Sequence, residues 1–432
     1  MPSADRGGPV TRDGGITRAW VLHPEILSDP DRRTAGPALE EAVALAAALP
    51  GMAVAGAEVV RLSRPHPGAL FGSGKLEELA ERFRAEEVEL VLVDGPVSPV
   101  QQRNLEKAWK VKVLDRTGLI LEIFSDRART REGVLQVEMA ALSYQRTRLV
   151  RAWTHLERQR GGLGFVGGPG ETQIEADRRA IDEQLTRIRR QLDKVVKTRE
   201  LHREARRKVP FPVIALVGYT NAGKSTLFNR LTGAKVMAED MLFATLDPTM
   251  RGIDLPGGQK AILSDTVGFI SDLPTQLVAA FRATLEEVLE ADLILHVRDI
   301  SHPETGEQAA DVGAILGDLG VAEDTEILEV WNKIDLLGAE DRDAARARAA
   351  RDRGVFVISA ATGEGVGALT EAVTARLEGE RVERRLHLDF SEGRRRAWLH
   401  EQGVVETEEQ GADGFDLTVR WTPRQEKRFR DL

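Results

Sequence analysis

Apolar and polar residues are arranged in alternating blocks over residues 16–125, where short apolar runs are separated by stretches with helical spacing. Runs of five to seven mostly apolar residues have the length of strands, and apolar positions three and four apart predict helices. Such alternation favours a small α/β domain with a largely parallel sheet. The expected strands lie at 19–23, 57–62, 88–94 and 112–116, and the expected helices at 37–51 and 75–87.

Residues 126–208 show a different pattern, in which apolar side chains are spaced alternately four and three residues apart. This spacing places them in a narrow stripe along one face of a helix. A glycine-rich stretch at 161–170 separates two such stripes. We therefore expect two long antiparallel helices joined by a flexible tip loop. The stripes consist of Leu135, Met139, Leu142, Leu149, Trp153 and Leu156, and of Ile174, Ile181, Leu185, Ile188, Leu192 and Val195.

A third pattern begins at residue 209, where Pro210 and Pro212 end the second helix and a βαβ series runs to residue 377. Residues 378–432 predict a strand, a helix and two further strands, a small α+β domain. Residues 1–15 are rich in Gly, Pro and charge and predict a disordered tail. The expected fold class is α/β: this βαβ domain, an N-terminal α/β subdomain with a helical hairpin, and a C-terminal α+β domain.

The first chemical motif follows the strand at the start of the βαβ series. Residues 218–225 match G-x-x-x-x-G-K-[ST] between an apolar strand and a helix. Glycines there let backbone N–H groups converge on phosphate, and the helix N-terminus adds positive potential. Lys224 is expected to reach the β and γ phosphates, and Ser225 to ligate Mg²⁺. The candidate residues are Gly218, Tyr219, Thr220, Asn221, Ala222, Gly223, Lys224, Ser225 and Thr226.

Two segments later in the chain complete the expected phosphate site. Asp265 follows a strand and is expected in the outer shell of Mg²⁺, with Thr266, Val267 and the N–H of Gly268 near the γ phosphate. Before it, Thr245 is preferred over Thr249 as the threonine that closes over Mg²⁺ and senses the γ phosphate. The remaining candidates of this segment are Phe243, Ala244, Leu246 and Asp247.

The base is expected to be read by two further loops, each of which follows a strand. Residues Asn332, Lys333, Ile334 and Asp335 place a carboxylate where it can accept from both N1–H and the 2-amino group of guanine. Adenine cannot satisfy that carboxylate, so the expected discrimination is strong. A backbone N–H of Ser359, Ala360 or Ala361 is expected to meet guanine O6. Together these motifs predict that the βαβ domain at 209–377 is a P-loop GTPase domain.

Phe269 stands where many GTPases place a glutamine that orients the attacking water. A phenyl ring can neither orient water nor transfer a proton, so another group must do so. The candidate catalytic residues are therefore Lys224, Asn221, Thr245 and Gly268. GTPases that carry an asparagine at the position of Asn221 often bind K⁺ through it, which makes K⁺ a candidate cofactor beside Mg²⁺. The alternative is that Asn221 only braces the loop.

Composition and charge limit the class of protein, its location and its partners. The chain has 432 residues, no cysteine, 42% hydrophobic residues and 30% charged residues, which is typical of a globular protein and excludes disulfides and thiol chemistry. No apolar run is long enough to insert into a membrane, so we expect a cytoplasmic location. The net charge is −9, yet 126–208 carry an excess of Arg and Lys. Such an arm suits RNA phosphates, although two solvated helices would explain it equally well.

Several longer strings resemble the HflX family of GTPases, which is related to Obg. They are SPVQQRNLE (98–106), RTGLILEIFSDRARTREGVLQVEMAAL (116–142), GGLGFVGGPGETQIEADRR (161–179), FATLDPT (243–249) and DTVGFISDLPTQLVAAFRATLEE (265–287). The resemblance implies a monomeric factor that binds the large ribosomal subunit and splits stalled or idle ribosomes, notably under heat stress, with part of the protein held at ribosomes or membranes. It places the tip loop near ribosomal RNA, with candidate contacts Arg158, Arg160, Gly161, Gly162, Gly164, Phe165, Gly167 and Gly168.

Three other functions stay open at this point. The protein could be an assembly checkpoint for the large subunit, or a regulator of a membrane protease that acts through protein contacts alone. ATP-dependent RNA unwinding is a further alternative, against which Asp335 argues. Residues 71–75 (FGSGK) resemble a second phosphate loop but lack its first glycine and its hydroxyl, and predict a turn before a helix. ATP binding by the N-terminal region is retained as a minor alternative.

Overall fold

A computed structural model describes most of the chain. The described residues are 16–30, 32–159, 169–206, 211–234, 242–243, 249–271, 288–322, 325–378, 382–411 and 413–430.

The N-terminal sheet is four-stranded and parallel throughout, with strand order β2-β1-β3-β4. This confirms the expected parallel α/β arrangement. Two helices were absent from the expected elements: α3 begins at a capping box between Ser98 and Gln101, and α4 is buried on most sides. The elements are β1 (Thr17–Ile26), α1 (Ala35–Ala47), β2 (Met52–Leu62), α2 (Ser73–Ala85), β3 (Leu90–Val93), α3 (Pro99–Trp109), β4 (Lys112–Asp115) and α4 (Arg116–Arg127).

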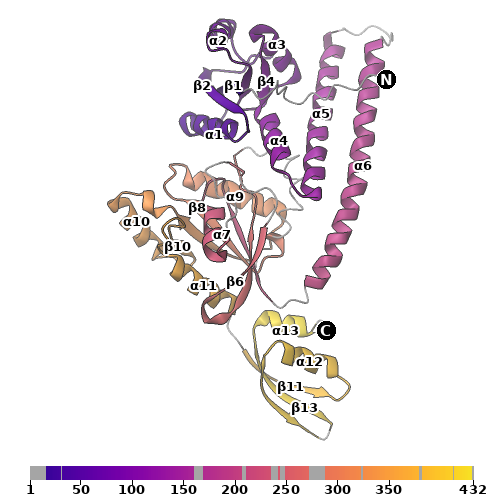
Figure 1. Cartoon of the computed structure of the whole chain (residues 1–432), viewed down its shortest axis with the longest axis vertical. Helices are drawn as coiled ribbons and strands as arrows, with labels where there is room; N and C mark the ends of the chain where they lie inside the picture. Colours follow the sequence, from indigo (N-terminus) through magenta and orange to yellow (C-terminus); the bar gives the residue numbers. More distant parts are fainter. Residues whose placement is uncertain are drawn as a thin grey trace.

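Helices α5 (Arg131–Gln159) and α6 (Pro169–Arg206) run side by side as a long hairpin (Figure 1). Leu185 and Ile188 of the second apolar stripe are buried. Arg146, the polar residue that interrupts the first stripe, pairs with Asp182 across the hairpin at 2.8 Å. Leu135 of the first stripe is buried as well, while the side chains of Leu149, Trp153, Leu156 and Ile174 lie outside the described residues. The apolar spacing thus indicated the packed face in the described part of α6.

The central sheet has six strands in the order β10-β9-β8-β5-β7-β6, and only the edge strand β6 is antiparallel to its neighbour. Helices flank this sheet, as expected for a P-loop GTPase domain (Figure 1). The elements are β5 (Val213–Gly218), α7 (Lys224–Thr232), β6 (Thr249–Asp254), η1 (Pro256–Gly258), β7 (Lys260–Asp265), β8 (Leu293–Asp299), α9 (Thr305–Leu319), β9 (Glu326–Asn332), η2 (Ile334–Leu336), α10 (Ala339–Ala349), β10 (Val355–Val357) and α11 (Val366–Glu378).

The C-terminal part is a three-stranded antiparallel sheet with order β11-β13-β12 and its own small core. Leu388, Leu399, Leu417 and Trp421 are buried in it. Its elements are β11 (Val382–Asp389), α12 (Gly393–Glu401), β12 (Val405–Gln410), β13 (Gly414–Trp421) and α13 (Pro423–Arg430). Among the described residues, no helix is both long enough and apolar enough to cross a bilayer.

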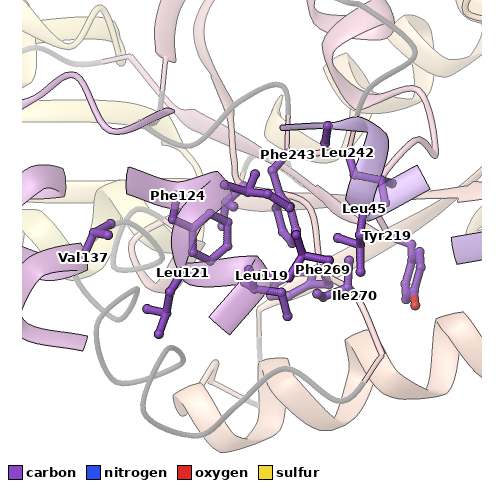
Figure 2. Packing of buried hydrophobic residues seen from close by; sticks show 14 of the residues in the cluster. Leu45, Leu119, Leu121, Phe124, Val137, Tyr219, Leu242, Phe243, Phe269 and Ile270 are labelled. Carbon is purple, nitrogen blue, oxygen red and sulfur yellow. The ribbon is translucent and has the colours of Figure 1, made fainter. Parts of the chain in front are cut away.

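One apolar cluster joins the N-terminal part to the central domain, and α4 lies at its centre. The rings of Phe124 in α4 and Phe243 meet edge to face with centroids 4.6 Å apart. Leu119 and Leu121 of α4 belong to the same buried cluster as Phe269 (Figure 2). The cluster therefore packs α4 against two segments that border the expected nucleotide site.

Candidate functional site

The four predicted motifs lie at one edge of the central sheet. Neighbouring parallel strands pair Leu216 with Asp265, Gly218 with Val297, and Asp299 with Asn332. Because parallel strands end at the same edge, the loops after β5, β7, β9 and β10 converge there. Residues that are far apart in sequence thereby form a single candidate site.

The loop after β5 has the backbone that a phosphate cradle needs. Gly218 has φ +148°, and a Cβ on it would lie 2.1 Å from the carbonyl oxygen of Val297. Asn221 adopts the left-handed region at φ 59°, and α7 begins at Lys224. Only glycine fits the close approach at position 218, so the loop can turn its N–H groups inward.

Lys224 is buried inside this loop. Its Nζ donates to the carbonyl oxygens of Gly218 at 3.0 Å and Tyr219 at 2.8 Å. Burial lowers the pKa of Lys224 to about 8, and the nearby Asp265 carboxylate works in the opposite direction. A bound triphosphate would add negative charge beside the ammonium and favour its protonated form.

Ser225 and Asp265 meet beneath the loop. The Ser225 hydroxyl donates to Oδ2 of Asp265 at 2.8 Å, and Asp265 is fully buried. Thr266 next to it donates to the carbonyl oxygen of Leu216 at 2.6 Å, which fixes the backbone after β7. A hydroxyl and a carboxylate are the oxygen ligands that a hard divalent cation prefers.

The segment after Asp265 lies against the phosphate loop. Thr220 N–H donates to the carbonyl oxygen of Phe269 at 2.7 Å, and Phe269 N–H donates to that of Gly218 at 3.1 Å. A Cβ on Gly268 would lie 2.7 Å from the Thr220 side chain and 3.1 Å from Lys224 Nζ. The Phe269 ring is buried in the interdomain cluster. Gly268 is thus beside the phosphate loop, while the Phe269 side chain belongs to the core.

Asn332 joins the two ends of the site. Its amide nitrogen donates to the carbonyl oxygen of Ala222 at 2.8 Å, and its Oδ1 accepts from Ala360 N–H at 2.8 Å. Lys333 pairs with Asp299 at 2.7 Å, and Asp335 is half-buried in the 3-10 helix η2. Ile334 is buried, and Ser359 and Ala360 are buried after β10. Asn332 therefore ties the two expected base-reading segments to the phosphate loop.

Some of the predicted residues cannot be placed in this geometry. Ala244, Thr245, Leu246 and Asp247 lie outside the described residues, whereas Phe243 is described and buried. Of the RNA-contact candidates, residues 160–168 also lie outside, and Arg158 is described only as part of α5. The roles of these residues stay predictions.

Residues of the N-terminal part reach the site, which the motifs did not indicate. The Tyr219 hydroxyl donates to Glu41 of α1 and accepts from the backbone N–H of Ser271. Arg116, at the start of α4, donates to the carbonyl oxygen of Ser271 at 2.7 Å and to Asp94 at 2.7 Å. Burial and the Glu41 carboxylate raise the pKa of Tyr219, so its hydroxyl keeps its proton. No local sequence signal marks these residues, because their partners are remote in the chain.

Asp94 is a buried acid that binds Arg116, Arg33 and His23. Burial alone would raise the pKa of its carboxyl, but the hydrogen bond with His23 and the charges of Arg116 and Arg33 outweigh burial and lower the pKa to about 2. Arg33 donates to Asp94 Oδ2 at 2.7 Å. The acid is therefore ionised at neutral pH and holds two guanidinium groups.

Known sequence families match the chain over most of its length. They are described as "GTP-binding GTPase N-terminal" over 37–125, "GTP-binding GTPase Middle Region" over 127–206, "50S ribosome-binding GTPase" over 213–333 and "HflX C-terminal domain" over 344–430. Among relatives, GTPase HflX of Magnetococcus marinus is 49% identical over 93% of this chain and 91% of its own length. This chain belongs to the HflX family of GTPases. GTPase HflX of Escherichia coli is 48% identical over 82% of this chain and 83% of its own length.

Membership of the HflX family agrees with the geometry of the central domain and establishes its chemistry as GTP hydrolysis. A solved structure of a GTP-binding protein from Sulfolobus solfataricus in complex with GDP covers 83% of this chain and 98% of that one, at 23% identity and a TM-score of 0.45.

Proposed function

We propose that this HflX-family GTPase binds the large ribosomal subunit and, with GTP bound, splits stalled or idle ribosomes, most of all under stress. The observation that carries the proposal is the basic hairpin attached to a GTPase domain of the "50S ribosome-binding GTPase" family. An assembly checkpoint for the large subunit and regulation of a membrane protease are the alternatives.

The charge distribution on α6 supports an RNA partner. RNA carries one negative charge per nucleotide, so a row of solvent-facing guanidinium groups attracts its backbone. Helix α6 is long enough to carry such a row, and the sequence between the two helices is rich in glycine, which would let RNA approach the backbone closely. On the described part of α6 the exposed acids Glu175, Asp177 and Glu183 lie before residue 187, so the basic excess falls at 187–194, where only Asp193 is acidic. The exposed basic residues are Arg178, Arg179, Arg187, Arg189, Arg190 and Lys194.

Contacts around α4 support coupling between the nucleotide and the hairpin. Asp115, which caps α4, accepts from Tyr144 at 2.6 Å and from Arg148 at 3.0 Å, both on α5. The next residue, Arg116, binds the segment after Gly268. A displacement of that segment by the γ phosphate would therefore reach the hairpin through two adjacent residues.

We propose the following roles within the site. Lys224 contacts the β and γ phosphates, and Gly268 N–H contacts the γ phosphate. Ser225 and Thr245 would ligate Mg²⁺, with Asp265 in its outer shell; the buried Ser225–Asp265 pair fits such an ion. Mg²⁺ supplies positive charge against the phosphate oxygens.

Asn221 gives a testable role to K⁺. Phe269 is buried and cannot orient the attacking water. A K⁺ ion held by Asn221 would supply positive charge next to the phosphate oxygens on which negative charge develops during hydrolysis. We expect GTP hydrolysis by the full chain to be at least about tenfold faster in KCl than in NaCl. Asn221→Ala should remove that difference, whereas Asn104→Ala, in the N-terminal part, should retain it. Equal rates in both salts for the unaltered chain would remove K⁺ from the proposal.

Sedimentation with ribosomes tests the main proposal. We expect the full chain, with a non-hydrolysable GTP analogue, to convert intact ribosomes into subunits and to sediment with the large one. Arg187→Glu combined with Arg190→Glu should weaken binding by roughly tenfold or more, because two phosphate contacts become repulsive. Arg351→Glu combined with Arg353→Glu makes the same charge change on exposed residues of the GTPase domain and should bind normally.

The alternatives predict different sedimentation. Binding only to free large subunits, with intact ribosomes unchanged, would favour the assembly checkpoint. No co-sedimentation at low salt would contradict both ribosomal functions and favour a protein partner.

A further inference from the structure

Arg230 lies in α7, six residues after the phosphate-loop lysine, and points its guanidinium at the loop after β10. Its Nε donates to the carbonyl oxygen of Ala360 at 2.6 Å, and its Nη2 donates to that of Ala361. Arginine presents its donors in a planar fork, so one side chain holds two successive carbonyls in a fixed direction. The loop that carries Ser359–Ala361 is therefore clamped from the helix that begins at the phosphate loop.

Fixing those carbonyls also fixes the N–H groups beyond them. A trans peptide is planar and directs its C=O and N–H to opposite sides. Because the oxygens of Ala360 and Ala361 face Arg230, the N–H groups of Ala361 and Thr362 face away from it. Thr362 N–H donates to the Ser359 hydroxyl at 3.0 Å. The Ala361 N–H belongs to the peptide whose carbonyl oxygen binds Arg230, so Arg230 sets its direction.

The guanidinium of Arg230 lies where a side chain at position 363 would be, which a glycine leaves open. Gly363 has φ +94°, and a Cβ on it would lie 2.7 Å from Arg230 Nη1. The loop closes on itself around this point, since Gly363 N–H donates to Ser359 O at 2.8 Å and Ser359 N–H donates to Glu364 O at 2.9 Å. A side chain at 363 would displace the arginine, so the loop is shaped around it.

The loop is held from a second direction by Asn332, which accepts from Ala360 N–H at 2.8 Å. Asn332 thus sets the peptide before Ala360, and Arg230 sets the two peptides after it. We propose that Arg230 is a positioning residue for guanine specificity, which aims a backbone N–H of this loop at O6 of the base. The inference rests on the assignment of Ser359–Ala361 to guanine O6.

Nucleotides that differ by one atom or one group test this directly. Calorimetry on the full chain with Mg²⁺ would compare GDP, 6-thio-GDP and IDP. The thio analogue replaces O6 by a weaker acceptor, and IDP lacks only the 2-amino group. In Arg230→Ala we expect GDP affinity to fall about tenfold, in keeping with lost charge-assisted hydrogen bonds. The preference for GDP over 6-thio-GDP should shrink toward one, while the preference for GDP over IDP should persist.

Matched variants separate positioning from general damage. Arg346→Ala removes an exposed arginine that binds Glu364 on the same loop, and we expect it to keep both preferences. Arg230→Lys keeps the charge but lacks the planar fork that fixes both carbonyls in one direction, so it should recover part of the 6-thio discrimination. Where Arg230→Ala does not fold, Arg230→Gln keeps one donor and serves in its place, with melting temperature as the folding check.

Three outcomes would overturn the inference. An equal loss of affinity for all three nucleotides would make Arg230 a purely structural residue. Unchanged affinities would show that the clamp does not influence base recognition. If the wild-type chain itself bound GDP and 6-thio-GDP equally but preferred GDP to IDP, the O6 assignment would fail while guanine binding stood.

Discussion

Asp335→Asn is expected to exchange guanine for xanthine as the preferred base. The carboxylate should accept from N1–H and the 2-amino group of guanine, whereas an amide offers one acceptor and one donor. Xanthine has N1–H and a 2-oxo group, which match that pair. With GTP, the variant loses the hydrogen bond from the 2-amino group to a charged oxygen, and its own amide N–H₂ then faces that 2-amino group. Together these two effects cost about 3–6 kcal/mol, or roughly 10²–10⁴ in GTP affinity. Hydrolysis of XTP and GTP at equal concentrations by the full chain measures the exchange.

The control for this experiment is Asp341→Asn, which makes the same chemical change at an exposed carboxylate in α10. It should leave GTP preference intact. A variant at 335 that still hydrolyses GTP at the original rate and concentration dependence, and gains nothing with XTP, would show that another group reads the base. Because Asn332 and Ala360 hold the surrounding loops independently of Asp335, the exchange should cost little stability.

The fold class could be predicted because its signals are local. Four strands of the central sheet, β5, β7, β9 and β10, are short apolar runs followed by a motif, and parallel strands necessarily bring those ends to one edge. The hairpin could be predicted because its apolar stripes repeat over many turns. Arg146, which interrupts one stripe, is explained by Asp182 on the opposite helix.

The elements that escaped prediction lack such periodicity. Helix α4 buries Leu119, Ile120, Leu121, Ile123 and Phe124. A helix that is apolar on most sides has no polar face to reveal its period, and a short apolar run fits strand and helix alike. Helix α3 is signalled only by its capping box and moderate amphipathicity. Tertiary packing therefore decides α4, whereas the capping box of α3, followed by Pro99, is a local signal that predicts the start of a helix.

Contacts between remote residues were also beyond local reasoning. Glu41 reaches Tyr219 across 178 residues, and Arg230 reaches Ala360 across 130. In the sequence, a glutamate or an arginine within a helix looks the same whether its side chain is solvated or bound to a remote partner. Only the packing of α1 and α7 against the site gives these residues their partners. The motifs therefore indicate where the nucleotide is expected to bind, and the folded structure adds the remote side chains, such as Glu41 and Arg230, that hold the motif residues in place.

Removal of Arg116 is expected to cause the largest loss of stability. This guanidinium is almost fully buried and binds Asp94, Glu41 and the carbonyl oxygen of Ser271. Arg116→Met fills a similar volume but deprives the buried Asp94 and the partly buried Glu41 of their shared guanidinium. Breaking a buried ion network in this way costs about 3–5 kcal/mol. That corresponds to a fall of roughly 6–20 °C in the melting temperature of the unit that contains the interface.

Differential scanning calorimetry of the full chain, with and without GDP, measures this effect. Arg82→Met is the matched control, because Arg82 pairs with Glu58 while 41% of its side chain is exposed; an exposed pair contributes at most about 1 kcal/mol. Arg116→Lys retains the charge but cannot reach three acceptors at once, so it should recover only part of the loss. If Arg116→Met melted like the control, the buried cluster would contribute no more than a surface pair. The link from the nucleotide site through α4 to the hairpin would then have to depend on apolar contacts such as Phe124 with Phe243 alone.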